Sequence, residues 1–231
     1  MKTSNKLLLG FLATIIGIMV FIAFQLKAEY KKINLNDKYR NYDRIALSSV
    51  KFLAIEGPVN NEDYGDADDF SIKCIVANEK ALLLPKNDFF RKHISYVYRG
   101  DTLLIHSTLP YPYDLDIFLL GVFPQVIKAN CARINIDSLK LTDMQLNLEQ
   151  RAMVSISQTQ LSQIIAKLSG KAQLSINKNT AVNDLSLTLQ QQSELNLGLV
   201  KLAKVSLQMS DSAKITATKA NLFLLQKSVA L

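Results

Sequence analysis

The sequence predicts an all-β protein, a single-chain parallel β-solenoid with rungs of about 20 residues that is preceded by one transmembrane helix. Two observations predict this fold. The C-terminal half repeats one alternating apolar pattern every 20 or 21 residues, and an uncharged block of 18 residues lies near the N-terminus. We expect three parts: a membrane anchor over residues 1–28, an N-terminal β region that caps the solenoid over 29–125, and regular rungs over 126–231.

The N-terminal block, residues 7–24, reads LLLGFLATIIGIMVFIAF. An apolar helix needs about 20 residues to cross a bilayer, whereas the apolar region of a signal peptide is shorter and ends in a small-x-small cleavage site. Leu26 stands where such a site needs a small residue, and no Cys follows the block closely enough to carry a lipid. These features favour an uncleaved single-pass anchor over a cleaved signal peptide.

The charges beside this helix and its other features predict opposite orientations in the membrane. Four positive residues follow the helix and two precede it: Lys27, Lys31, Lys32 and Arg40 against Lys2 and Lys6. The positive-inside rule alone would therefore place the C-terminal domain in the cytoplasm. The signal-like position of the helix, together with the resemblance given below, favours a bacterial inner-membrane protein with its solenoid in the periplasm.

The repeat becomes visible when five segments are aligned: CARINI (131–136), RAMVSI (151–156), KAQLSI (171–176), QSELNL (192–197) and SAKITA (212–217). Their second position is always small, and the steps between these positions are 20, 20, 21 and 20 residues. Alternation with period 2 indicates strands with one buried face, whereas a helix would show a period of 3.6. One rung cannot bury its apolar face alone, so the rungs should stack about 4.8 Å apart around one core.

Two further series keep the same period. Nine or ten residues after each small position comes an aliphatic residue: Leu141, Leu161, Val182, Leu202 and Leu222. Alternating runs then follow at 144–148, 164–168, 185–189 and 205–209. A polar series, Asn135, Ser155, Ser175, Asn196 and Thr216, lies between the apolar positions of the first strand. It could form a polar strip for a glycan or a partner, but we favour an ordinary solvated strand face.

The upstream half also reads as β structure. Short apolar or alternating runs at 45–47, 50–55, 70–76, 93–98 and 103–106 are separated by turn residues. Arg99-Gly100-Asp101 predicts a hairpin between the last two runs. The apolar stretch 115–127 is too short to cross a membrane and contains Pro124, so it predicts a core strand.

Several of these segments resemble a known family. The opening Tyr42-Asp43-Arg44-Ile45, the GDTLLI hairpin (100–105) and the stretches LSLTLQQQSELNL (185–197) and VSLQMSDSAKITA (205–217) look like the auto-transporter adhesin, head GIN-like domains of Bacteroidetes-type bacteria. The similarity covers most of 30–225, although this chain has few glycines at the rung corners. The resemblance implies a β-solenoid exported to the periplasm or the cell surface, and it implies no site residues.

The sequence contains few residues that could form a catalytic, metal-binding or cofactor-binding site. His93 and His106 show no metal-ligand spacing, and phosphate-loop, dinucleotide-binding and nucleophile-elbow motifs are absent. We expect Cys74 to be buried, Cys131 to point outward or lie at a corner, and no disulfide to join them. The net charge of +7 comes from scattered lysines, which suits a soluble stacked surface rather than nucleic-acid binding. We therefore expect no catalytic residues and no cofactor.

Two loops contain candidate binding residues. The acidic loop with Asp63, Asp66, Asp68 and Asp69 has oxygen ligands of the kind that calcium needs, but it lacks the EF-hand order, and we favour a solvated loop. Tyr111 and Tyr113 flank Pro112 and could stack on a sugar or a partner. For these two rings we favour packing on the body of the fold.

Three functions follow as hypotheses. The first is a non-enzymatic, membrane-anchored envelope protein whose solenoid serves adhesion or binds an envelope glycan or protein partner. The second is a structural scaffold that forms a homo-oligomer through its C-terminal rung, because the apolar tail 222–231 has no polar cap. The third is a polysaccharide-acting β-helix enzyme, which needs clustered carboxylates that the rungs after residue 150 do not show.

Overall fold

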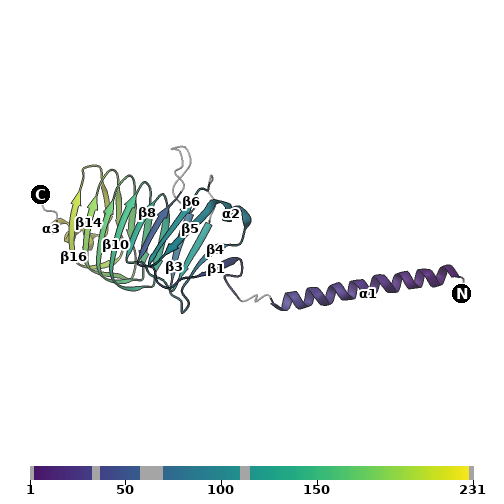
Figure 1. Ribbon diagram of the computed structural model, residues 1–231. Coiled ribbons are helices and arrows are strands. Elements are labelled where there is room, and N and C mark those ends of the chain that lie inside the picture. The colour runs from purple at the N-terminus through teal and green to yellow at the C-terminus, as the bar shows by residue number, and fades with distance from the viewer. Residues whose placement is uncertain (1–2, 33–36, 58–69, 110–114, 229–231) are drawn as a thin grey trace. The chain divides into compact units, whose positions relative to one another are not determined.

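The computed structural model describes residues 3–32, 37–57, 70–109 and 115–228. The chain forms two compact units, Met1–Asn41 and Tyr42–Leu231. The first unit contains one helix, α1 (Thr3–Lys32), in which Gly10–Lys27 is long and apolar enough to cross a membrane (Figure 1). An N-terminal apolar helix is therefore confirmed. An anchor and a signal sequence share this feature.

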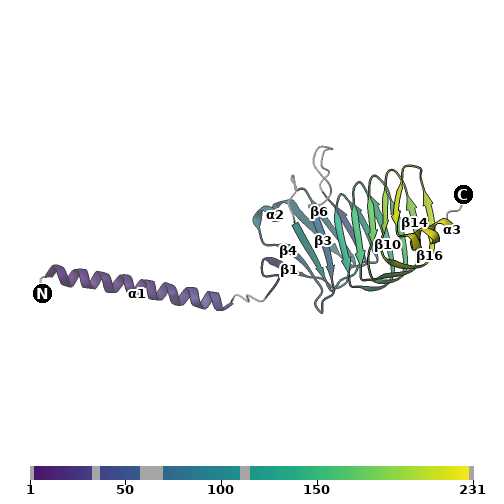
Figure 2. The same cartoon turned by 180° about the vertical axis from the view of Figure 1, so that it is seen from behind.

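The second unit is mostly β, as predicted, and its strands form two sheets. Sheet A contains, in spatial order, β1 (Tyr42–Ala46), β4 (Ala81–Pro85), β7 (Leu115–Leu120), β3 (Phe70–Ile75), β9 (Arg133–Asp137), β11 (Met153–Ser157), β13 (Gln173–Ile176), β15 (Glu194–Leu197) and β17 (Lys214–Ala217). Sheet B contains β16 (Val200–Met209), β14 (Thr180–Leu189), β12 (Gln160–Leu168), β10 (Lys140–Glu149), β8 (Val126–Asn130), β2 (Phe52–Glu56), β6 (Thr102–Ser107) and β5 (Ile94–Arg99). Two helices, α2 (Asp88–His93) and α3 (Lys219–Ser228), lie near the two ends of this unit (Figures 1 and 2).

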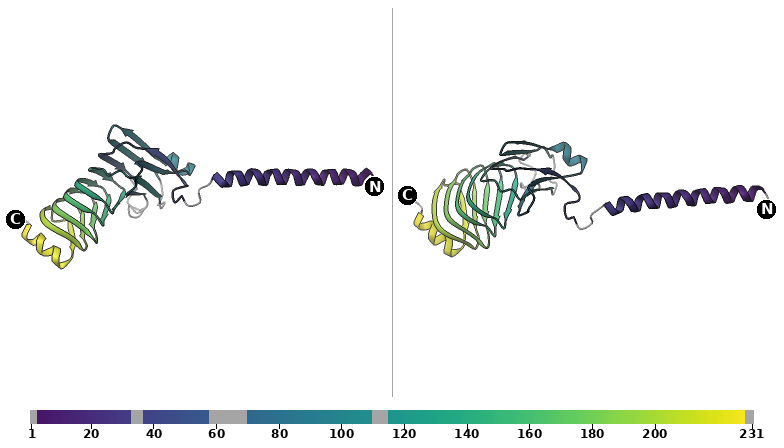
Figure 3. Two further views of the ribbon diagram at one scale, coloured as in Figure 1. Left: turned by 90° about the horizontal axis from the view of Figure 1, so that it is seen from below. Right: turned by 60° about the horizontal axis from the view of Figure 1, so that its bottom comes forward.

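The strands from β8 to β17 make about five regular turns of a parallel β-solenoid, which is the predicted fold (Figure 3). Each turn contributes one strand to each sheet, and successive strands pair in parallel. The register follows the repeat, because Val154 pairs with Ile134 on one side and with Leu174 on the other. The one additional residue of the 21-residue rung falls in the turn between β13 and β14.

The core lies between the two sheets. The small residues Ala132, Ala152, Ala172 and Ser193 are fully buried, and most of the aliphatic residues that alternate with polar ones along the strands from β8 to β15 are buried too. This burial explains the period of 2, since every second side chain points into the stack. The polar series beginning at Asn135 lies in register on the opposite face of sheet A, so the sequence alignment of these residues is confirmed.

Residues other than Gly adopt left-handed conformations at most corners of the solenoid, so the repeat needs few glycines. Left-handed backbone conformations occur in pairs at Gln150 and Arg151 (φ 41° and 60°) and at Gln191 and Gln192 (φ 48° and 60°). Residues other than Gly are disfavoured there by about 1–2 kcal/mol. Each corner is held by the next turn, since the Arg151 amide donates to the Gly170 carbonyl at 2.9 Å. Stacking thus stabilises a conformation that an isolated turn would avoid.

The first turns are stacked out of sequence order. The turn formed by β2 and β3 lies between the turn of β6 and β7 and the turn of β8 and β9. The chain must therefore cross an earlier turn after β7, and Gly121 (φ +59°) lies in this crossing, where a Cβ atom would be 2.3 Å from the Glu79 carbonyl oxygen. The sequence did not predict this order.

The antiparallel cap at this end contains the predicted hairpin, in which Gly100 lies between β5 and β6. The apolar stretch 115–127 differs from the prediction, because it belongs to two strands, β7 and β8, that lie in different sheets. Gly121 and the residues after it break the run, so the chain changes sheets there.

The C-terminal end also differs from the prediction. The tail that we expected to leave the last rung uncapped instead contains α3, which packs against β16. Leu225 on this helix is only 4% exposed. Leu222, which we expected to continue the aliphatic series, lies on α3 and is 41% exposed. The strand repeat therefore ends at β17, and α3 packs against β16, the sheet B strand of the last turn.

Candidate functional site

A groove of about 550 Å³ crosses the outer face of sheet B and is the larger of the two candidate sites. Its lining residues lie on five successive strands, β8, β10, β12, β14 and β16, or directly after them. Most of them are polar: Lys128, Asn147, Glu149, Lys167, Ser169, Thr188, Gln190 and Gln208. The regular turns therefore form one continuous polar surface along the solenoid axis.

Five of these residues form a row, which we call the central row: Lys128, Asn147, Lys167, Thr188 and Gln208. Each is the direct pairing partner of the next along sheet B. Neighbouring strands lie about 4.8 Å apart, so the row presents one polar side chain at each such step. The pattern arises because these positions lie between the buried residues of each long strand, such as Leu146 and Leu148.

The two lysines of the central row are exposed and two turns apart. Within the described ranges neither amine forms an ion pair, whereas Lys204 and Lys214 on the last turn pair with Asp184 and Glu194 on the turn before it. Glu149 is the one acidic residue that lines the groove in the described part of the chain. The groove can therefore offer two lysine charges against one carboxylate, together with amide and hydroxyl groups.

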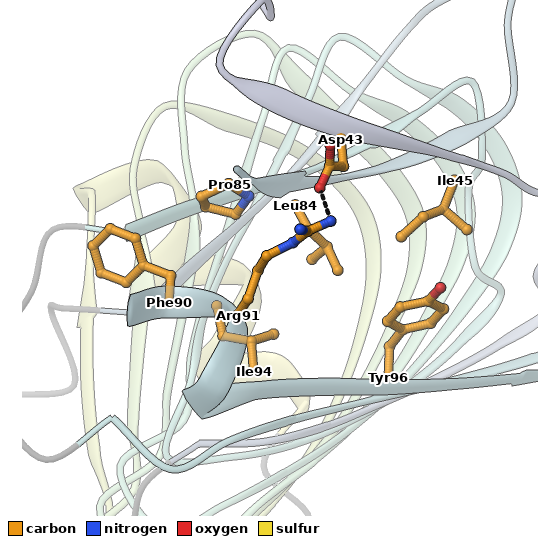
Figure 4. Close-up of a pocket in the computed structure, with 8 residues that line it drawn as sticks. All are labelled: Asp43, Ile45, Leu84, Pro85, Phe90, Arg91, Ile94 and Tyr96. Carbon is orange, nitrogen blue, oxygen red and sulfur yellow. Dashed lines mark hydrogen bonds and ion pairs between the residues drawn. The ribbon is translucent and has the colours of Figure 1, made fainter. Parts of the chain in front are cut away.

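A second hollow, of about 230 Å³, lies at the N-terminal end of the solenoid, between β1 and β4 of sheet A and β5 of sheet B (Figure 4). Its apolar lining includes Ile45, Leu84 and Phe90. The Arg91 guanidinium on α2 forms an ion pair with the Asp43 carboxylate on β1 across this space. A ligand would have to displace that pair, so the groove on sheet B is the stronger candidate.

Neither histidine that the sequence singled out is among the residues that line the groove or the second hollow. Asp63, Asp66, Asp68, Asp69, Tyr111 and Tyr113 lie outside the described residues. His93 lies at the end of α2, where its Nδ1 is 3.3 Å from the Thr108 hydroxyl, and the His106 ring lies 3.4 Å from the Glu56 carboxylate. Across the described ranges, no three His, Cys, Asp or Glu side chains gather as a metal site would require.

The two cysteines behave as structural residues. Both thiols are free, as expected. Cys74 is buried in β3, as predicted, and burial raises its pKa to about 12. Cys131 lies at a corner (φ 48°), also as predicted, and partial burial raises its pKa while the Arg151 charge opposes that change. A thiol with a raised pKa is a poor nucleophile at neutral pH.

The sequence carries a signal for the central row. Polar residues recur between the apolar positions of the runs 144–148, 164–168, 185–189 and 205–209, as they do in the polar series on sheet A. What the sequence could not show is that this second series lines a hollow. No family model and no curated protein matches this sequence.

Proposed function

We propose that this chain is a non-enzymatic, membrane-anchored envelope protein that presents its β-solenoid and binds an extended partner along the groove of sheet B. The central row is the observation that carries the proposal. It places five polar side chains in register over five turns, and two of them are lysines that form no ion pair with any residue that the structure describes. A linear polymer would meet equivalent groups at regular steps on such a surface.

The N-terminal helix and the family resemblance support the location. An apolar helix followed directly by a compact β unit suits a tethered domain. The resemblance to head GIN-like domains implies an exported solenoid, which favours the periplasmic side of a bacterial inner membrane.

The composition of the groove argues against hydrolysis. Glycosidases use two carboxyl groups about 5–9.5 Å apart. Glu149 has no second carboxylate beside it among the groove residues that the structure describes. The scaffold hypothesis is the weaker alternative, because α3 packs against β16 of the turn that self-association would use.

The location is tested by protease treatment of intact spheroplasts that carry the full-length chain with a C-terminal tag. We expect external protease to digest the domain, and the mass of the untreated protein to include residues 1–28. Digestion only after lysis would place the solenoid in the cytoplasm and overturn the envelope proposal.

The use of the groove is tested in the same cells with a photo-crosslinking amino acid at position 188, in the central row. The matched control carries it at position 175, on the outer face of sheet A. We expect a high-molecular-mass product from position 188 alone. Equal crosslinking from both positions, or none from position 188, would contradict binding along the groove.

A further inference from the structure

We infer that the groove of sheet B binds an anionic polysaccharide that carries a carboxylate on every second sugar. The inference rests on the proposed function and names its ligand class. It starts from the positions of Lys128 and Lys167, which are exposed, face the same groove and lack an acidic partner in the described part of the chain. Two such cations attract an anionic ligand, and the distance between them favours a ligand whose negative charges have the same spacing.

The separation of the two lysines is set by the register of the strands. Lys128 pairs with Asn147, and Asn147 pairs with Lys167, so the lysines lie two strands apart. At about 4.8 Å per strand, their backbone positions are about 9.6 Å apart. This is close to the length of a disaccharide in an extended β-linked polysaccharide. A chain lying along the groove would therefore bring two alternate sugars opposite the two lysines.

The positions between and beyond the lysines suit uncharged sugars. Asn147 lies between the lysines, and Thr188 and Gln208 continue the row. Amide and hydroxyl groups can donate and accept hydrogen bonds, as sugar hydroxyl groups do. The groove thus offers a cation, a neutral group and a cation at successive steps, followed by two neutral groups.

Glu149 adds discrimination against a fully charged polymer. It lies two residues after Asn147 on the same strand, β10, and it also lines the groove. A polymer with a carboxylate on every sugar would place one on this turn, where Glu149 repels it. Like charges at close range favour the polymer whose middle sugar is neutral.

The test uses the full-length protein in detergent and three polymers of known charge spacing. Hyaluronan carries a carboxylate on alternate sugars, polygalacturonate carries one on every sugar, and dextran carries none. We expect hyaluronan to bind, with an affinity that falls as salt is raised. Lys128→Gln with Lys167→Gln should weaken this binding about tenfold, whereas Lys178→Gln with Lys201→Gln, at exposed lysines outside the groove, should leave it unchanged.

A second variant tests the spacing without changing the net charge. The pair Asn147→Lys and Lys167→Asn moves one lysine to the neighbouring strand, so that the two cations become adjacent. We expect the preference to shift from hyaluronan toward polygalacturonate. Thermal melts of all variants should match that of the parent protein, because the substituted side chains lie on the outer face.

Polymer binding tests the ligand class, and crosslinking from position 188 tests the proposed function, so the two can fail separately. Equal binding of dextran, preference of the parent protein for polygalacturonate or for a nucleic acid, or no binding of any polymer would each refute the ligand class. If crosslinks from position 188 persist in those cases, the groove still binds a partner of another kind. If they are lost as well, the proposed function is wrong.

Discussion

The side-chain amide of Asn221 on α3 donates a hydrogen bond to the carbonyl oxygen of Gly198, at 3.0 Å. Gly198 lies between β15 and β16, so the bond fixes the helix to the last full turn of the solenoid. Asn221 is buried, and the contact satisfies a carbonyl group near the end of the stack. Together with the buried Leu225, it makes α3 a cap for the C-terminal end.

The cap gives a first prediction about stability. Leu225→Ala should lower the free energy of unfolding by about 2–3 kcal/mol, because it removes a buried side chain from the contact between α3 and the core. Leu222→Ala on the exposed side of the same helix should change it by less than about 0.5 kcal/mol. Urea denaturation of the two variants measures the difference. Equal losses would mean that α3 does not pack in this way.

The small position of the fourth aligned segment gives a second prediction. Ser193 is fully buried where the other turns have Ala, and its hydroxyl finds no hydrogen-bond partner among the described residues. Burying an unpaired hydroxyl costs about 1–3 kcal/mol. Ser193→Ala should therefore raise the free energy of unfolding by about 1 kcal/mol, as urea denaturation can measure. A destabilised variant would show that the hydroxyl has a partner.

The buried Cys74 predicts a loss of stability at high pH. In the folded chain burial raises its pKa from 9.0 to about 12. Below pH 9 the thiol stays protonated in both states, so stability does not depend on it. Between pH 9 and 12 the unfolded chain releases the proton while the folded chain keeps it, so stability should fall by about 1.4 kcal/mol per pH unit.

The control for this prediction is Cys74→Ala, because other groups also titrate in that range. The parent protein should lose stability more steeply than the variant when urea denaturation is repeated from pH 8 to 11. In addition, a thiol reagent at pH 8 should modify Cys74 only after unfolding. Equal pH slopes for the two proteins would contradict the burial of this thiol.

The regular turns could be predicted from the sequence because residues at equivalent positions of the repeat lie side by side in the stacked turns. Residues that share a place in the period, such as Ile134, Val154 and Leu174, are pairing partners in sheet A. Each turn contacts mainly its neighbours, so a local pattern fixes the register. The corners needed few glycines, because the bonds between turns hold residues such as Arg151 in left-handed conformations.

The parts that the sequence did not predict depend on contacts between distant segments. The order of the first turns is set by pairing of β2 with β8 and β6, strands far apart in the chain, and no repeat marks it. The groove is also a property of the folded surface. Asn147 and Lys167 could be aligned from the sequence, but the hollow that they share comes from the shape of sheet B.

The rung of 21 residues gives the last prediction, which tests the register itself. The additional residue lies in the turn between β13 and β14, where Lys178 is exposed. Deletion of Lys178 should restore the 20-residue spacing and leave the protein folded, with a melting temperature within about 5 °C of the parent. Deletion of Ser175 in β13 removes the same number of residues but reverses the face on which the rest of that strand points. Leu174 and Ile176 could then no longer both face the core, so this variant should fail to fold cooperatively in a thermal melt followed by circular dichroism. If both deletions were tolerated equally, the strict alternation of buried and exposed residues would not determine the stack.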